Sequence, residues 1–188
     1  MANLMELLSF GDSGWGDELA HGVLVTVTLA LATLPLGLLI GFLIAVAKNS
    51  SEPLLRNAAH VYTTIFRGLP ELLTLFLIYY GGQMAMSALW RLLFGVPFEV
   101  NSYLAGMIAL ALMFSSYASE VFLSAFKGIT IGQYEGAYAL GLSRFRTMML
   151  IIVPQLVRLA LPGLSNLWLI LLKDASLVSV IGLPDLLR

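Results

Sequence analysis

Residues 22–47 form an uncharged stretch that constrains the fold more than any other part of this 188-residue chain. Built as an α-helix, these 26 residues measure about 39 Å, which exceeds the ~30 Å hydrocarbon core of a bilayer. The rest of the chain is similar in character, because 59% of its residues are apolar, only 11% are charged, and the mean hydropathy is +0.91. The sequence therefore predicts an all-α integral membrane protein.

Apolar runs of comparable length recur three more times along the chain. The predicted spans cover about residues 22–47, 62–90, 100–126 and 148–172. Within the first span, Gly37 and Gly41 are four residues apart, a spacing that lets another helix approach closely. Pro35 predicts a kink in the same span.

Basic residues are distributed unequally between the segments that join these spans. Segment 1–20 contains acidic residues but no Lys or Arg, so it also lacks the basic start of a signal peptide. The basic residues of the connections after the first and third spans are Lys48, Arg56, Arg67, Lys127, Arg144 and Arg146. Because Lys and Arg concentrate on the cytoplasmic side of a membrane, we expect both connections in the cytoplasm and the N-terminus outside.

The composition argues against several classes of protein. The chain has no cysteine, and its two histidines, His21 and His60, are far apart and lack the spacing of metal ligands. Its net charge of −1 gives no reason to expect a nucleic-acid partner. It also lacks the G-x-x-x-x-G-K-[ST] loop that holds nucleotide phosphates. We therefore predict no catalytic residue, no metal site and no bound cofactor, and hence no enzyme activity.

The connection 127–147 combines a helical pattern, a glycine break and basic residues, which indicates a structured loop. Residues 135–140 favour a short helix of about two turns, and Gly141 stands where that helix can end in a left-handed conformation. Ser143 is then suited to cap a second helix that continues into the span from residue 148. The sequence predicts a short helix, a sharp turn and a membrane helix.

Three landmarks in this loop and the following span share a fixed spacing, and they are Glu135-Gly136-Ala137, Gly141, and Ile151-x-Val153-Pro154. The segment resembles the EAA loop of ABC importer permeases, whose pattern is E-A-A-x3-G-x9-I-x-L-P. Gly136 and Val153 depart mildly from that pattern. The sequences F-R-G-L-P at 66–70 and L-K-D-A-S-L at 172–177 also resemble segments of polar amino acid permeases.

This resemblance implies a permease subunit with the helix bundle of type I ABC importers, occupying residues 22–188, in a bacterial inner membrane. The implied system imports polar amino acids, of the basic amino acid or opine group. Its other parts would be a second permease, of the same or a different chain, two cytoplasmic ATPase subunits that use ATP and Mg²⁺, and a periplasmic or extracellular binding protein. Family permeases have five spans, so the last one is expected to be missing here, leaving a short apolar piece at 178–183.

The resemblance also implies which residues transmit the energy of ATP hydrolysis. The short helix would seat in a groove of an ATPase subunit, and its motion would pass through the glycine turn to the fourth span. The predicted coupling residues are Glu135, Gly136, Ala137, Gly141, Ile151 and Pro154.

Acidic residues in or near the spans are candidates for the substrate pathway, because a cationic side chain favours acceptors there. They are Glu71, Glu120 and Asp174. Ordinary ion pairs are the alternative: Glu120 with Lys127 or another basic group, and Asp174 with Lys173 or Arg158. A secondary transporter or channel is the alternative function, but it predicts internal repeats, and the sequence has no visible repeat.

Overall fold

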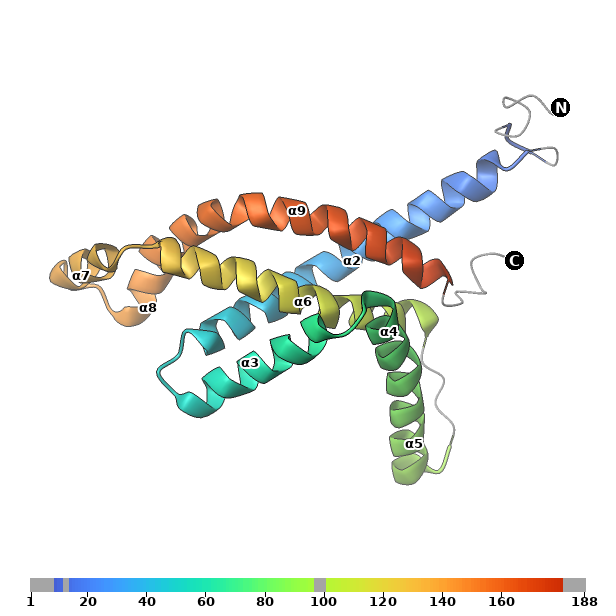
Figure 1. The fold of residues 1–188 in the computed structure, drawn as a ribbon, viewed down its shortest axis with the longest axis horizontal. Coiled ribbons are helices and arrows are strands. Elements are labelled where there is room, and N and C mark those ends of the chain that lie inside the picture. The colour runs from blue at the N-terminus through green and yellow to red at the C-terminus, as the bar shows by residue number, and fades with distance from the viewer. Residues whose placement is uncertain (1–8, 12–13, 97–100, 181–188) are drawn as a thin grey trace.

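The computed structural model describes residues 9–11, 14–96 and 101–180, and this part of the chain consists of helices and short connections without a strand (Figure 1). In chain order the elements are α2 (Gly16–Lys48), α3 (Pro53–Gly68), α4 (Glu71–Phe76), the π-helical turn η1 (Leu77–Gly81), α5 (Gly82–Phe94), α6 (Ser102–Gly128), α7 (Ile131–Ala139), α8 (Arg144–Thr147), the π-helical turn η2 (Met148–Ile152) and α9 (Val153–Val180).

Four helical segments of the described residues are long and apolar enough to cross a membrane. They are Gly16–Lys48, Glu71–Phe94, Ser102–Gly128 and Arg144–Val178. The predicted fold class, an all-α membrane protein with four visible spans, is therefore confirmed.

The second span starts later than expected, so the prediction of one helix over 62–90 is wrong at its beginning. α3 ends at Gly68, and the next two residues, Leu69 and Pro70, are extended, with ψ angles of 148° and 135°. Proline disfavours the helical conformation in the preceding residue and has no N–H to continue a helix. Tyr62 therefore belongs to a separate helix, α3, that precedes the span.

The fourth span is longer than predicted. α9 continues past residue 172 to Val180, so that Lys173 and Asp174 are helical residues and not part of a following loop. Residues 181–183 of the predicted C-terminal piece lie outside the described residues.

α6 lies at the centre of the bundle, where α2, α3, α4 and α9 all contact it. Ser115, Ser116 and Ser119 are fully buried on this helix, and each hydroxyl donates a hydrogen bond of 2.7 Å to a carbonyl three residues earlier. Because these bonds satisfy the hydroxyl donors, α6 can be enclosed by other helices without the cost of unpaired donors.

The glycine pair of the first span packs against α6, as its spacing predicted. A Cβ atom on Gly37 would lie 2.6 Å from Cδ1 of Phe114, and one on Gly41 would lie 2.8 Å from Cβ of Ala118. Both distances are too short for real contacts, so only glycine allows this approach of α2 to α6. The helix runs on through Pro35, which lies inside it.

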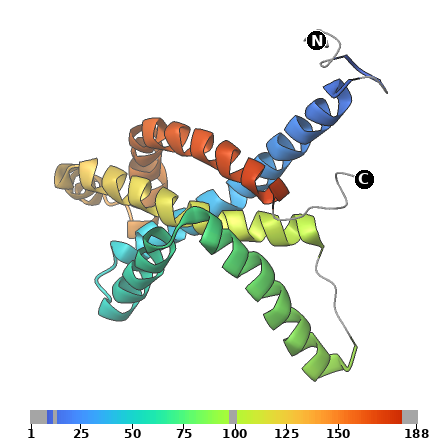
Figure 2. The same ribbon diagram turned by 45° about the vertical axis from the view of Figure 1, so that its right-hand side comes forward.

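The two basic connections lie at the same end of the bundle. Figures 1 and 2 show the α2–α3 connection and the α7–α8 segment at that end, whereas α5 extends away from the bundle. This arrangement brings the segment with the coupling pattern next to the ends of α2 and α6.

Candidate functional site

The helix α7 ends in a well-formed turn. The N–H of Gly141 donates to the carbonyl of Tyr138 at 2.9 Å, and the N–H of Leu142 donates to the carbonyl of Ala137 at 3.1 Å. With Gly141 left-handed at φ 77°, these two bonds make a Schellman motif. The predicted left-handed glycine is present, and the predicted short helix is present but begins four residues earlier than expected, at Ile131.

A second helix starts directly after this turn. The Ser143 hydroxyl accepts from the N–H of Arg146 at 3.4 Å, which is the predicted cap. α8 then passes through the π-helical turn η2 into α9, where Pro154 is the second residue. Ile151 lies in that turn and is half-buried. The sequence pattern thus spans one continuous unit, from α7 to the start of α9.

The three residues of the E-G-A segment face in different directions. Ala137 is buried, whereas Glu135 and Gly136 are exposed. Glu135 lines a hollow of about 470 Å³ together with Asn49, Phe126, Ile129, Tyr134 and Tyr138. Burial, with a smaller contribution from Tyr138, raises the pKa of Tyr134.

Large apolar side chains project from this end of the molecule. Ile131 is 74% exposed, Leu140 81% and Phe145 70%. We call these three residues the knob surface. Because Ile131 and Leu140 lie outside every candidate membrane span, lipid does not account for their exposure. Exposed large apolar side chains outside the membrane, such as Ile131 and Leu140, are typical of a protein interaction site.

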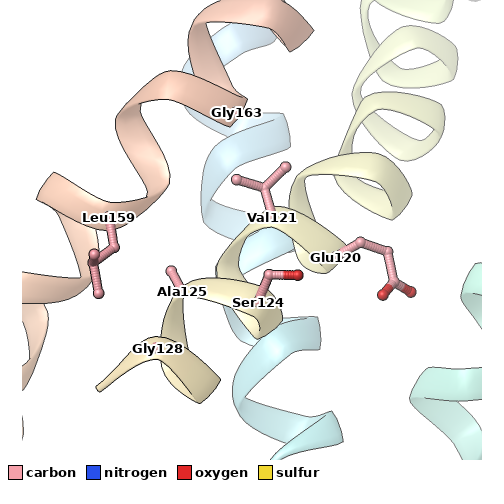
Figure 3. Close-up of a pocket in the computed structure, with 7 residues that line it drawn as sticks. All are labelled: Glu120, Val121, Ser124, Ala125, Gly128, Leu159 and Gly163. Carbon is pink, nitrogen blue, oxygen red and sulfur yellow. The ribbon is translucent and has the colours of Figure 1, made fainter. Parts of the chain in front are cut away.

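Glu120 of α6 forms ion pairs with basic residues of two other helices. Its Oε1 lies 2.5 Å from Nζ of Lys48 and 3.2 Å from NH1 of Arg67. The Lys48 side chain is only 1% exposed. Of the alternatives raised by the sequence, pairing with another basic group is correct and pairing with Lys127 is not. Glu120, Leu159 and Gly163 line the same hollow of about 410 Å³. Figure 3 shows the carboxylate of Glu120 pointing away from Leu159 and Gly163.

The other two candidate acids lie together. Asp174 on α9 is 3% exposed and is close to Glu71 at the start of α4. Glu71 in turn lies 3.8 Å from Nζ of Lys173. Among the described residues, Oδ1 of Asp174 has no hydrogen-bond partner. The structure therefore groups Glu71 with Asp174 and leaves Glu120 in a separate ion-pair cluster.

The family of the chain can now be stated. Residues 37–188 match the family described as binding-protein-dependent transport system inner membrane component. The chain belongs to this family. Helices long enough to span a membrane and a segment with the EAA-like spacing agree with that membership.

Individual relatives of this transport component are permeases. The chain is 39% identical over 186 residues to the nopaline transport system permease protein NocQ of Agrobacterium fabrum, and the match covers 98% of this chain and 79% of the relative. It is 34% identical over 175 residues to the histidine/lysine/arginine/ornithine transport system permease protein HisQ of Escherichia coli, covering 93% and 77%. A solved chain from the crystal structure of an amino acid ABC transporter with histidines has a TM-score of 0.71 and 32% identity, covering 92% of this chain and 75% of that chain.

Several contacts of this transport component have no signal in the sequence. The Tyr62 hydroxyl lies 2.8 Å from both the Leu112 carbonyl and the Ser115 hydroxyl, which fixes α3 to α6. The side chains of Gln133 and Gln155 form a hydrogen bond between α7 and α9. These partners are 50, 53 and 22 residues apart in sequence, so no local pattern indicates them.

Proposed function

We propose that this chain is the membrane-spanning permease subunit of an ATP-driven importer of polar amino acids, of the basic amino acid or opine group. The relatives support this substrate group, because their names refer to nopaline, octopine, arginine, or histidine, lysine, arginine and ornithine. The chain itself uses no ATP. Hydrolysis belongs to two cytoplasmic ATPase subunits, and a second permease and a substrate-binding protein complete the importer.

The observation that carries this proposal is the knob surface and its attachment. Ile131, Leu140 and Phe145 offer apolar area that a partner protein can bury. The Schellman turn at Gly141 joins this surface to α9 without a flexible linker. A partner that grips the knob surface therefore moves a membrane helix, which is the requirement for coupling hydrolysis to transport.

Each predicted coupling residue has a physical role in this mechanism. Glu135 supplies a charge and Gly136 adds no side chain on the exposed part of α7, so that this part can enter a groove on the ATPase, whereas Ala137 packs the helix against the rest of this chain. Gly141 forms the turn. Ile151 and Pro154 flank the change from η2 to α9, and a π-helical turn of this kind is a common place for functional bending.

The substrate pathway is expected to follow α9. Exposed polar side chains recur along this helix among exposed apolar ones such as Leu161 and Leu169, and the polar ones include Arg158, Ser165, Asn166 and Lys173. The exposed line of α2, in contrast, consists of apolar residues such as Leu31, Leu39 and Leu43. Polar side chains at membrane depth face water or protein, so these polar positions of α9 are suited to a pathway beside the second permease.

Among the candidate acids, Glu71 and Asp174 are better placed than Glu120 to attract a cationic substrate. Lys48 and Arg67 already neutralise Glu120. Among the described residues, Lys173 is the basic group that forms an ion pair with Glu71, so this ion pair leaves the charge of an ionised Asp174 unpaired. The distribution of basic residues also gives the orientation of this proposed subunit: the α2–α3 connection and loop 127–147 lie in the cytoplasm, and segment 1–20 lies on the opposite side of the inner membrane.

Two substitutions of one knob residue test the coupling role. In proteoliposomes containing the complete importer, Leu140→Asp is expected to lower both ATPase binding and substrate uptake about tenfold or more, because it removes a side chain whose burial is worth about 1.5–3 kcal/mol. Leu140→Met retains the apolar surface and should leave both quantities near wild type. Since Leu140 is exposed in this chain, neither change should alter folding.

The proposal has a clear contrary result. Substrate uptake by the permease in vesicles without any ATPase subunit would contradict an ATP-driven importer and favour a secondary transporter. Equal uptake by Leu140→Asp and Leu140→Met would contradict the role of the knob surface.

A further inference from the structure

A side-chain hydrogen bond joins the first turn of α7 to the beginning of α9. Nε2 of Gln155 donates to Oε1 of Gln133 at 3.0 Å, and also to the carbonyl of Ile151 in η2 at 2.9 Å. A carboxamide has two N–H groups on this nitrogen, so one side chain can serve both acceptors. Gln155 thus connects three elements: α7, η2 and α9.

The position of this bond along α7 gives it mechanical significance. The Schellman turn holds the C-terminal end of α7 through Gly141. Gln133 is the third residue of the same helix, so its bond to Gln155 holds the N-terminal end. If α7 were attached to α9 only at its C-terminal end, it could pivot about that end without moving α9. Because it is attached at both ends, its rotation is transmitted to α9.

The residues at the α9 side of the bond lie where that helix is irregular. Gln155 directly follows Pro154, which has no N–H to donate, and it bonds to the π-helical turn that precedes the proline. The bond therefore connects α7 to the part of the membrane helix that is best able to bend.

We propose that Gln155, with Gln133, is a positioning residue that makes α7 and α9 move as one unit when the ATPase subunits close. This inference depends on the proposed function of the knob surface and adds a second path of transmission beside the Gly141 turn. Gln155 contacts neither nucleotide nor substrate in this mechanism. It converts motion of α7 into motion of α9.

The quantity that tests this proposal is the number of substrate molecules imported per ATP hydrolysed by the reconstituted importer. Gln133→Leu and Gln155→Leu should each lower this ratio about twofold to tenfold, the range that one net hydrogen bond provides. The double variant should be no worse than Gln155→Leu alone, because Gln155→Leu already removes the bond between the two side chains. Gln133→Glu combined with Gln155→Lys should restore the ratio through an ion pair.

Two further measurements separate positioning from a general structural effect. The thermal unfolding midpoint and the amount of co-purified ATPase should stay at wild-type values in the leucine variants, since Gln133 is exposed and Gln155 is only half-buried. As a matched control, Gln83→Leu on α5 makes the same chemical change away from the loop and should leave the ratio unchanged.

The outcomes distinguish the inference from the proposed function. If Leu140→Asp abolishes uptake but the glutamine variants keep the wild-type ratio, the positioning role is wrong and the knob surface stands. Additive losses in the double variant, or no recovery in the Glu–Lys pair, would also overturn the positioning role. If Leu140→Asp has no effect either, the role of the knob surface fails as well, whereas uptake without any ATPase subunit would contradict the importer itself.

Discussion

Lys48 and Glu120 are 72 residues apart in the chain, yet their side chains form the most buried ion pair among the described residues. Lys48 is enclosed, whereas Glu120 is about one-third exposed and also binds Arg67. An ammonium group without water needs a partner, because burying an unpaired charge is far more costly than burying a paired one. Lys48 therefore depends on Glu120 more than Glu120 depends on Lys48.

From this asymmetry we predict that Glu120→Gln destabilises the bundle by about 3 kcal/mol, the low end for breaking a buried ion pair. Thermal unfolding in detergent measures the change. Lys127→Gln is the control, because Lys127 is exposed and is not paired with Glu120. Replacing both partners, with Lys48→Met and Glu120→Leu, should recover most of the loss. Equal unfolding midpoints for Glu120→Gln and Lys127→Gln would contradict this account.

Two glycines of the coupling segment should respond in opposite ways to the same substitution. A Cβ atom meets nothing within 4 Å at either Gly136 or Gly141. Gly136→Ala should stabilise α7 by about 0.5–1 kcal/mol, since alanine is the better helix former. Gly141→Ala should cost about 1–2 kcal/mol, because a left-handed conformation strains residues with a Cβ.

Hydrogen exchange of the α7 amides measures both effects. Exchange should slow in Gly136→Ala and accelerate in Gly141→Ala. Gly141→Asn should fall between wild type and Gly141→Ala, because asparagine tolerates the left-handed region better. A change of the same sign at both positions would show that backbone conformation does not control this helix.

At the level of whole elements, local patterns predicted much of the structure of segment 127–147. The turn at Gly141 and the cap at Ser143 depend on residues within five positions of one another, so the sequence contains all the information needed. The break at Leu69 and Pro70 also had a local signal, the residue before a proline. The predicted span 62–90 crossed this break because hydropathy averaged over a long stretch does not show where a helix stops, although Arg67 and Glu71 interrupt the apolar run there.

Cysteine labelling can test directly which face of α9 lines the substrate pathway. The chain has no cysteine, so single cysteines need no altered background. A membrane-impermeant thiol reagent should label Ser165→Cys and Asn166→Cys in the assembled importer. It should not label Leu39→Cys or Leu43→Cys on the apolar line of α2, where lipid excludes water. Labelling of the α2 positions but not the α9 positions would reverse the assignment of the two faces.

For the molecule as a whole, the class, the number of visible spans and the loop segment followed from the sequence, whereas the pairing of charges did not. Hydropathy and spacing are properties of short stretches. Which helices lie side by side is decided by packing around α6, and that packing selects Lys48 and Arg67 as partners of Glu120 and sets Glu71 beside Asp174. The sequence alone therefore identified Glu71, Glu120 and Asp174 as candidates but did not distinguish their roles.

That separation gives a prediction for the transported substrate. If Glu71 and Asp174 attract the cationic group, Asp174→Asn should lower the ratio of cationic to neutral amino acid uptake. Lys173→Met should raise this ratio, because it removes a competing positive charge. Uptake from equimolar mixtures by the reconstituted importer gives the ratio directly. Glu120→Gln should lower total uptake through its effect on stability but leave the ratio unchanged. A ratio that follows Glu120 and ignores Asp174 would move the substrate site to the ion-pair cluster, because the acid that meets the substrate is the one whose charge sets the preference.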